Sequence, residues 1–173
     1  SFDVVVTDNE VPVITGMPSD FEVDTDPGTC AAMVTWAAPS ANDNCEVASL
    51  TSDFASGHAF PVGTSTVTYT ATDVNGNTST ASFDVVVTDV ELPVITTNGD
   101  QTVDSAAGTC EATVTVSATA TDNCSVGTPN GVRSDGKLLT DPFPAGTTTI
   151  RWNVADAYGN SAPEVVQTVI VED

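Results

Sequence analysis

The sequence predicts an all-β protein that consists of two tandem β-sandwich domains. Three features predict this: an internal repeat, short segments in which polar and apolar residues alternate, and turn residues between those segments. The octapeptide at residues 1–8 recurs unchanged at 82–89, so the period is about 81 residues, enough for one small domain. We therefore expect the last strand of a preceding repeat at 1–8, a first domain at 9–89 and a second domain at 90–173.

The alternating segments have the period of a β-strand, in which successive side chains point to opposite faces. Thr66–Thr72 places Val67, Tyr69 and Ala71 on one face and threonines on the other. A second such segment follows at 82–88, and the Asn and Gly residues between the two are typical of a hairpin turn. Each repeat contains about seven short segments of this kind, which indicates a sandwich of two sheets.

The chain is strongly acidic: it has 24 Asp and Glu residues, 3 Lys and Arg residues and a formal net charge of −21. Such a charge repels nucleic acids and anionic membrane surfaces, so we expect no nucleic-acid partner. No apolar run approaches the roughly 18 residues that a membrane span needs, so we expect no membrane insertion. Crowded carboxylates favour divalent cations, which makes calcium the candidate cofactor.

Several landmarks recur along the chain, and together they resemble the hyalin repeat (HYR) family. They include a Pro-Val-Ile-Thr segment at 12–15 and 93–96, an Asp-Asn-Cys triplet at 43–45 and 122–124, and a Phe-Pro-Val-Gly-Thr segment at 60–64. The resemblance covers essentially the whole chain. It implies immunoglobulin-like extracellular modules that often form long tandem arrays and serve in adhesion or as spacers.

Each repeat contains two cysteines at matched positions, Cys30 with Cys45 and Cys110 with Cys124. The chain lacks the histidines and the Cys-x-x-Cys spacing of a zinc site, so the matched pairs indicate disulfides and an oxidising compartment. We therefore expect one disulfide within each repeat. Closing a loop of this length would stabilise its domain by roughly 3 kcal/mol in the chain-entropy description.

The acidic linkers and turns form the candidate metal site. Carboxylates recur where the chain enters each repeat, and Asp and Asn recur in the turn before the last strand. In an immunoglobulin-like sandwich these two segments lie at the same end, and together they can supply the six to eight oxygen ligands that calcium prefers. The candidate ligands are Asp8, Glu10, Asp43, Asp73, Asn75, Asn77, Asp89, Glu91, Asp122, Asp156 and Asn160.

Two alternatives remain open at this site. Asp and Asn also favour solvated turns for conformational reasons, without any metal. In addition, Asp43 belongs to the triplet that ends in Cys45, and bonded cysteines have Cα atoms within about 7 Å of each other. A disulfide between Cys45 and Cys30 could therefore hold Asp43 at the opposite end of the domain.

Two further candidate sites lie on predicted loops. Asn77-Thr-Ser is an N-glycosylation sequon, with Asn77 as the acceptor. Arg133 and Lys137 lie in a longer loop of the second repeat and are two of the three basic residues. We expect both to face the acidic surface of a neighbouring chain in a lateral contact, because every other surface of the molecule repels a second copy.

No group of residues indicates catalysis, since His58 has no second histidine, activated nucleophile or carboxylate pair around it, and we expect no enzyme. Three functions remain. The favoured one is a structural repeat of a long extracellular surface or filament protein, a spacer that assembles with like repeats and is rigidified by calcium. The alternatives are an adhesin module that binds a carbohydrate or a protein, and a non-catalytic appendage of a secreted enzyme.

Overall fold

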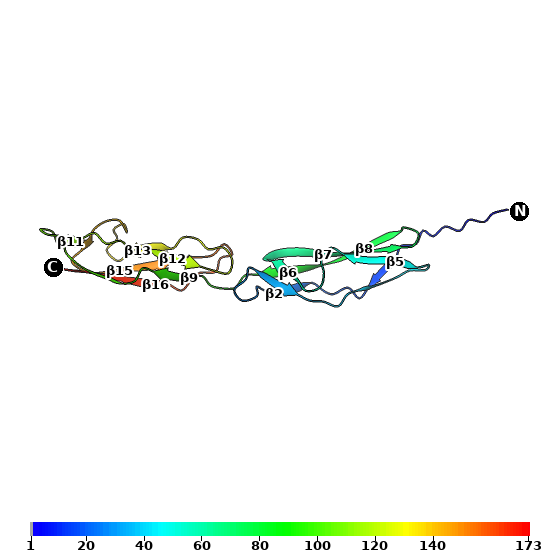
Figure 1. Ribbon diagram of the computed structural model, residues 1–173, viewed down its shortest axis with the longest axis horizontal. Coiled ribbons are helices and arrows are strands. Elements are labelled where there is room, and N and C mark those ends of the chain that lie inside the picture. The colour runs from blue at the N-terminus through cyan, green and yellow to red at the C-terminus, as the bar shows by residue number, and fades with distance from the viewer. Residues whose placement is uncertain (1) are drawn as a thin grey trace. The chain divides into compact units, whose positions relative to one another are not determined.

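The structure is a computed structural model that describes residues 2–173. Strands are the regular elements of this range, and the chain divides into two compact units, Ser1–Thr88 (unit 1) and Asp89–Asp173 (unit 2). Each unit is an immunoglobulin-like β-sandwich (Figure 1), so the predicted fold class is confirmed. The division between the units falls one residue before the predicted boundary.

Unit 1 contains a four-stranded sheet and, packed against it, two short strand pairs. The order in the sheet is β2 (Phe21–Asp24), β8 (Thr78–Thr88), β7 (Gly63–Asp73) and β5 (Val47–Ser52). The short pairs are β1 (Val13–Thr15) with β4 (Ser40–Asn42), and β3 (Ala31–Val34) with β6 (His58–Pro61). All neighbours are antiparallel except β2 and β8, which run parallel.

Unit 2 repeats this topology. Its four-stranded sheet has the order β10 (Gln101–Asp104), β16 (Val165–Glu172), β15 (Gly146–Asn153) and β13 (Asn130–Arg133). The short pairs are β9 (Val94–Thr97) with β12 (Ala118–Thr121), and β11 (Glu111–Ala112) with β14 (Phe143–Pro144). The edge strand β10 runs parallel to β16, as β2 does to β8.

The core of each unit lies between its layers and contains one indole hydrogen bond. The side chains that the alternation of 66–72 predicts to point inward are all buried: Val67, Tyr69 and Ala71. Trp36 Nε1 donates to the Tyr69 hydroxyl at 2.8 Å in unit 1. In unit 2, Trp152 Nε1 donates to Gln167 Oε1 at 3.0 Å. The two tryptophans therefore serve packing, each with its polar atom satisfied.

Each unit has a leading end, which holds the linker and the turn between its last two long strands, and a trailing end, where its last strand finishes. In unit 1 the turn at the leading end is 73–77, where Gly76 adopts a φ of 93°. β8 starts beside this turn and finishes at Thr88, whose carbonyl accepts from Thr25 N at 3.0 Å. The 11 residues of β8 therefore separate the two ends by roughly 35 Å.

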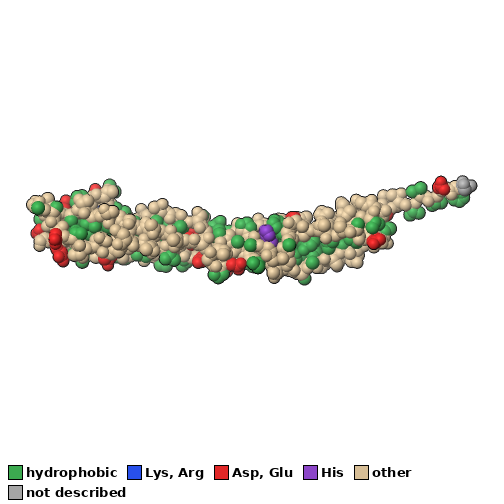
Figure 2. Space-filling model, viewed as in Figure 1, with side chains coloured by type: hydrophobic (Ala, Val, Ile, Leu, Met, Phe, Trp, Pro, Cys, Tyr) green, Lys and Arg blue, Asp and Glu red, His purple; other side chains and the backbone are tan. Residues whose placement is uncertain are grey.

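Residues 2–12 form no strand, although a strand was predicted at 1–8, of which Ser1 lies outside the described residues. A strand requires a hydrogen-bonded neighbour, and none of the described strands pairs with this segment. The described chain also contains no helix that is long and apolar enough to cross a bilayer. Acidic side chains are visible on the surface (Figure 2), in keeping with the net charge of −21.

Candidate metal site at the leading end of each unit

In unit 1 the leading end brings together the linker, the Asp-Asn-Cys triplet and the β7–β8 turn. The Asp8 carboxylate accepts from Asn44 Nδ2 at 3.3 Å and from Asn75 Nδ2 at 3.1 Å. One carboxylate oxygen each of Asp8 and Asp43 and the Sγ of Cys45 lie within 4.8 Å of one another. Asp43 therefore lies at the same end as the other candidate ligands. The alternative that a disulfide holds Asp43 at the opposite end of the domain is wrong.

Unit 2 contains the same arrangement. Asp89 is 3% exposed, and its Oδ1 accepts from Asn123 Nδ2 at 3.1 Å. One carboxylate oxygen each of Asp89, Asp122 and Asp156 lie within 4.8 Å of one another. Segments about 80 residues apart thus bring the linker aspartate and the triplet aspartate together in both units, and the third group is Cys45 in unit 1 and Asp156 in unit 2.

Three of the predicted ligands brace the carboxylates through their amide nitrogens. Asn160 Nδ2 donates to the Asp89 carbonyl at 3.0 Å and to Asp156 Oδ2 at 2.7 Å. Both partners can only accept, so the amide nitrogen must face them. Asn77 makes the equivalent bonds in unit 1, and Asn75 donates to Asp8. Coordination of a metal through the Oδ1 atoms of these asparagines stays a prediction.

The aspartates of the two turns are held in the ionised form. Burial raises the pKa of Asp73, but hydrogen bonds from the side chain and backbone of Asn77 outweigh it, and the pKa lies below its usual value. The pKa of Asp156 is lowered in the same way, with Asn160 as the main donor against burial. Both turns therefore present a fixed negative charge at neutral pH.

The linker glutamates act through their backbone. Glu10 N donates to Asp8 Oδ1 at 3.1 Å, and Glu91 N makes the equivalent bond at 3.3 Å. The bond from Glu10 is the main cause of the lowered pKa of Asp8.

The site also includes Asn44 and Asn123, which sequence reasoning missed. Their repetition within the Asp-Asn-Cys triplet was the available signal.

The cluster in unit 2 fits a calcium ion better than the cluster in unit 1. Calcium takes oxygen ligands, and unit 2 offers three carboxylates, whereas unit 1 offers two carboxylates and a thiol. The Oδ1 atoms of Asp43 and Asp122 are buried and have no hydrogen-bond partner among residues 2–173. A buried carboxylate oxygen without a partner is costly, and a bound cation would satisfy it.

The predicted disulfides within the repeats are wrong. Cys45 and Cys110 are free thiols, whereas Cys30 and Cys124 are disulfide-bonded. The reason lies in the two ends of the sandwich: Cys30 follows the turn at the trailing end of unit 1, and Cys45 lies at its leading end. The length of β8 separates them, far beyond the roughly 7 Å that a disulfide allows between Cα atoms.

The predicted glycan acceptor Asn77 uses its side-chain amide within the fold, and its glycosylation stays a prediction. Its Nδ2, the atom that would carry a glycan, donates to Asp73 Oδ2 at 2.7 Å and to the Asp8 carbonyl at 3.3 Å. A glycan would replace one of the two hydrogens that make these bonds. The sequon therefore lies where the fold itself uses the amide.

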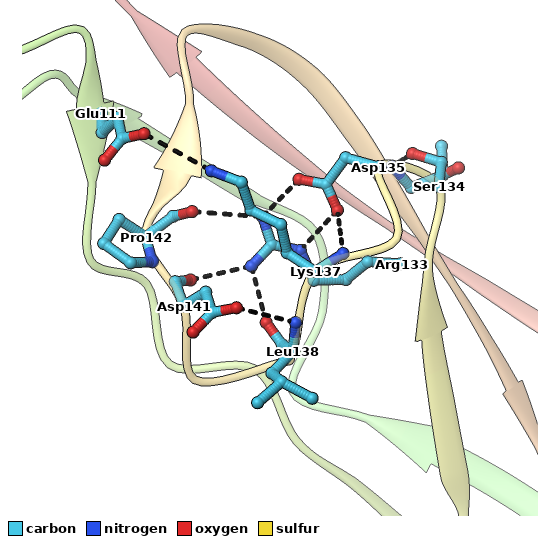
Figure 3. Close-up of polar contacts among 9 residues, drawn as sticks. Glu111, Arg133, Ser134, Asp135, Lys137, Leu138, Asp141 and Pro142 are labelled. Atoms are coloured by element: carbon cyan, nitrogen blue, oxygen red, sulfur yellow. Dashed lines mark hydrogen bonds and ion pairs between the residues drawn. The ribbon is translucent and has the colours of Figure 1, made fainter.

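Arg133, predicted to be a surface contact residue, is 3% exposed. Its guanidinium lies 3.8 Å from the centre of the Phe143 ring and forms an ion pair with Asp135, with 2.6 Å between Nη2 and Oδ2. Nη1 donates to the carbonyls of Leu138 and Asp141, both at 2.8 Å (Figure 3). The loop after β13 thus folds back around this side chain, and the prediction of a lateral contact is wrong for Arg133.

Lys137 is the other predicted contact residue, and its side chain is 43% exposed. Its Nζ lies 3.5 Å from Glu111 Oε1, and the Glu111 side chain is itself 46% exposed. Such a pair contributes about 0–1 kcal/mol and is screened by salt. A lateral contact through Lys137 therefore stays a prediction.

The ion pair between Arg133 and Asp135 makes the stability of unit 2 dependent on pH. The hydrogen bond from Arg133 holds the pKa of Asp135 below its usual value. Because the folded-state pKa is lowered, the contribution is complete above the unfolded-state pKa of about 4 and is lost as the pH falls through the folded-state value. We expect Asp135→Asn to cost stability at pH 7 and little at about pH 2. Urea unfolding of both proteins across this range measures the difference, and an equal cost at both pH values would contradict it.

Comparisons with known proteins agree with the resemblance read from the sequence. A family model described as the HYR domain matches residues 7–87. Hyalin from Strongylocentrotus purpuratus is 33% identical over 95% of this chain, and hyalin from Lytechinus variegatus is 34% identical over 98%. The chain spans 14% and 33% of the length of these two proteins. A mouse protein named for its sushi, von Willebrand factor type A, EGF and pentraxin domains is 42% identical over 53% of the chain, which spans 3% of it.

Solved structures also match the chain, at low sequence identity and low TM-score. Protocadherin gammaB7 EC3-6 gives a TM-score of 0.44 with 15% identity, over 95% of this chain and 51% of that one. The fibronectin(III)-like modules of Clostridium thermocellum CbhA give 0.36 with 12% identity, over 93% and 94%. On the family match and the hyalin relatives, the chain belongs to the HYR family of extracellular modules.

Proposed function

We propose that this chain is a structural segment of a long extracellular surface or filament protein, in which HYR domains serve as spacers and associate with like repeats. The observation that supports this most directly is the duplicated leading end, where Asn77 braces Asp73 in unit 1 and Asn160 braces Asp156 in unit 2 through the same hydrogen bond. Modules that had specialised for separate ligands would differ at such a site. Domains that are alike and carry the same bracing suit a repeated structural role.

We further propose that calcium binds at the leading end and rigidifies it. The residues that would hold it in unit 2 are Asp89, Asp122 and Asp156, whose oxygens already converge. In unit 1, Asp8 and Asp43 offer a weaker version, because Cys45 contributes sulfur in place of oxygen. The ion would offset the repulsion between these carboxylates and fix the linker against the turn.

The experiment is thermal unfolding of the chain in chelator and in millimolar calcium. A ligand that binds only the folded protein stabilises it by RT ln(1 + [L]/Kd), about 2.7 kcal/mol at a hundredfold excess over Kd. We expect unit 2 to melt at a higher temperature in calcium and Asp122→Asn to abolish most of the shift. Hydrogen exchange assigns the shift to unit 2 or unit 1.

The control must separate binding from charge screening, since any salt weakens self-repulsion in a chain with a net charge of −21. Sodium chloride at matched ionic strength and Glu22→Gln, which removes one charge from the exposed edge strand β2, supply that control. If sodium gives the same shift as calcium, or if Glu22→Gln removes it as well as Asp122→Asn does, the calcium site is refuted.

A further inference from the structure

The four cysteines occupy two kinds of position. Cys30 and Cys110 each follow a Gly-Thr pair at the trailing end of a unit, and Cys45 and Cys124 each end an Asp-Asn-Cys triplet at the leading end. Each kind has one bonded and one free member. Among trailing cysteines Cys30 is disulfide-bonded and Cys110 is a thiol, and among leading cysteines Cys124 is disulfide-bonded and Cys45 is a thiol.

Neither free thiol has a partner within its own unit that it can reach. The trailing and leading ends of unit 1 are separated by the full length of β8, and unit 2 has the same topology with β16 in that place. Cys45 and Cys110 are both exposed, so a cysteine of another repeat can approach either of them. Their counterparts show that both kinds of position support a disulfide in this fold.

We propose that Cys45 and Cys110 are linking cysteines, and that each forms a disulfide with the complementary cysteine of another HYR repeat: a leading cysteine bonds with a trailing one. The partner is therefore a second HYR repeat, on the same polypeptide or on a second copy of this chain. The inference rests on the proposed function in one respect, because it requires that repeats adjoin. It turns a row of separately folded domains into a covalently joined array.

The chemistry is thiol–disulfide exchange with a small-molecule disulfide such as oxidised glutathione. The thiolate of Cys110 attacks one glutathione sulfur, forms a mixed disulfide and releases one reduced glutathione. The thiolate of Cys45 then attacks the Cys110 sulfur and releases the second. Two thiols are oxidised to one disulfide, one glutathione disulfide is reduced to two thiols, and the two protons pass to the released glutathione thiolates.

Proximity favours this exchange in an array. Repeats on one chain meet at an effective concentration in the millimolar range. Cysteines that are held together in this way react faster than the same groups on dilute, separate molecules.

The test uses the full chain, two variants and oxidised glutathione at about pH 8.5 and about 1 mM protein, the concentration that a tether would supply. Cys45→Ser retains only the trailing thiol, and Cys110→Ser retains only the leading one. On a non-reducing gel we expect wild-type protein to form a ladder in steps of 17.6 kDa, each variant alone to stay monomeric, and an equal mixture of the two to form a dimer. Peptide mapping of that dimer should recover Cys45 linked to Cys110.

The outcomes separate the linkage from the proposed function. If each variant dimerises alone as fast as the mixture, or if the mixture forms no dimer, the pairing rule is overturned. The calcium-dependent melting of Cys110→Ser, whose substitution lies outside both metal clusters, is measured on the same samples and reports the proposed metal site independently. Mapping of the unoxidised protein should find Cys30 and Cys124 in disulfide-linked peptides and Cys45 and Cys110 alkylated; a peptide that links Cys30 to Cys45 would overturn the proposal as well.

Discussion

Replacing Arg133 by alanine is expected to destabilise unit 2 by about 3–5 kcal/mol, the usual cost of removing one partner of a buried charged network. The side chain satisfies the carbonyls of Leu138 and Asp141 and the carboxylate of Asp135, and it covers the face of Phe143. Alanine removes the donors and leaves a void above the ring. A domain stability of 5–15 kcal/mol is typical, so the loss would be visible in any unfolding measurement.

Two variants identify the cause. Arg133→Met fills most of the volume but donates nothing, so it should recover only the packing part of the loss. Lys137→Ala removes a positive charge from the same loop, where the side chain is exposed, and should cost less than about 1 kcal/mol. Hydrogen exchange should show faster opening of unit 2 and no change in unit 1. If Arg133→Ala and Lys137→Ala cost the same, Arg133 does not anchor the loop.

The strands and the repeat could be predicted from the sequence because their signals are local. The alternation over 66–72 specifies which side chains of β7 are buried, and all three predicted side chains are. Because the sequence repeats, the same strand prediction applies to the second unit, where β15 and β16 take the places of β7 and β8. The contact between the linker and the β7–β8 turn could also be predicted, because both segments lie at the same end of an immunoglobulin-like sandwich.

The cysteine partners and the role of Arg133 could not be predicted in this way. Matched spacing is the same whether Cys45 pairs within its repeat or outside it. Only the folded structure shows that Cys30 and Cys45 lie at opposite ends of the sandwich that β8 spans. In the sequence, Arg133 is a charged residue in a polar loop, which predicts an exposed side chain. Its burial depends on carbonyls that point inward only after the loop has closed, which is a property of the folded backbone and not of residue type.

Replacing Gly131 by alanine is expected to destabilise unit 2 by about 1–3 kcal/mol, the usual cost of forcing an extra carbon into a packed core. Gly131 on β13 lies opposite Trp152 on β15, and an added Cβ would lie 2.7 Å from Cζ3 of that ring. The ring cannot move aside easily, because it is 3% exposed and its Nε1 is bonded to Gln167 at 3.0 Å.

Gly127 supplies the matched control. It belongs to the same unit, and a Cβ there would meet its nearest neighbour, the Ala155 carbonyl oxygen, at 3.5 Å, an ordinary contact. Neither glycine has a positive φ, so both substitutions restrict the unfolded chain to a similar extent, an effect of about 0.4–1 kcal/mol that favours folding. The difference between the two variants therefore isolates the overlap with Trp152.

We expect Gly127→Ala to be neutral or slightly stabilising in urea unfolding. We expect Gly131→Ala to be destabilising, with altered near-ultraviolet circular dichroism from the displaced indole. Equal stability of the two variants would mean that the indole can shift within the core at little cost, and that the glycine opposite it is not required by packing.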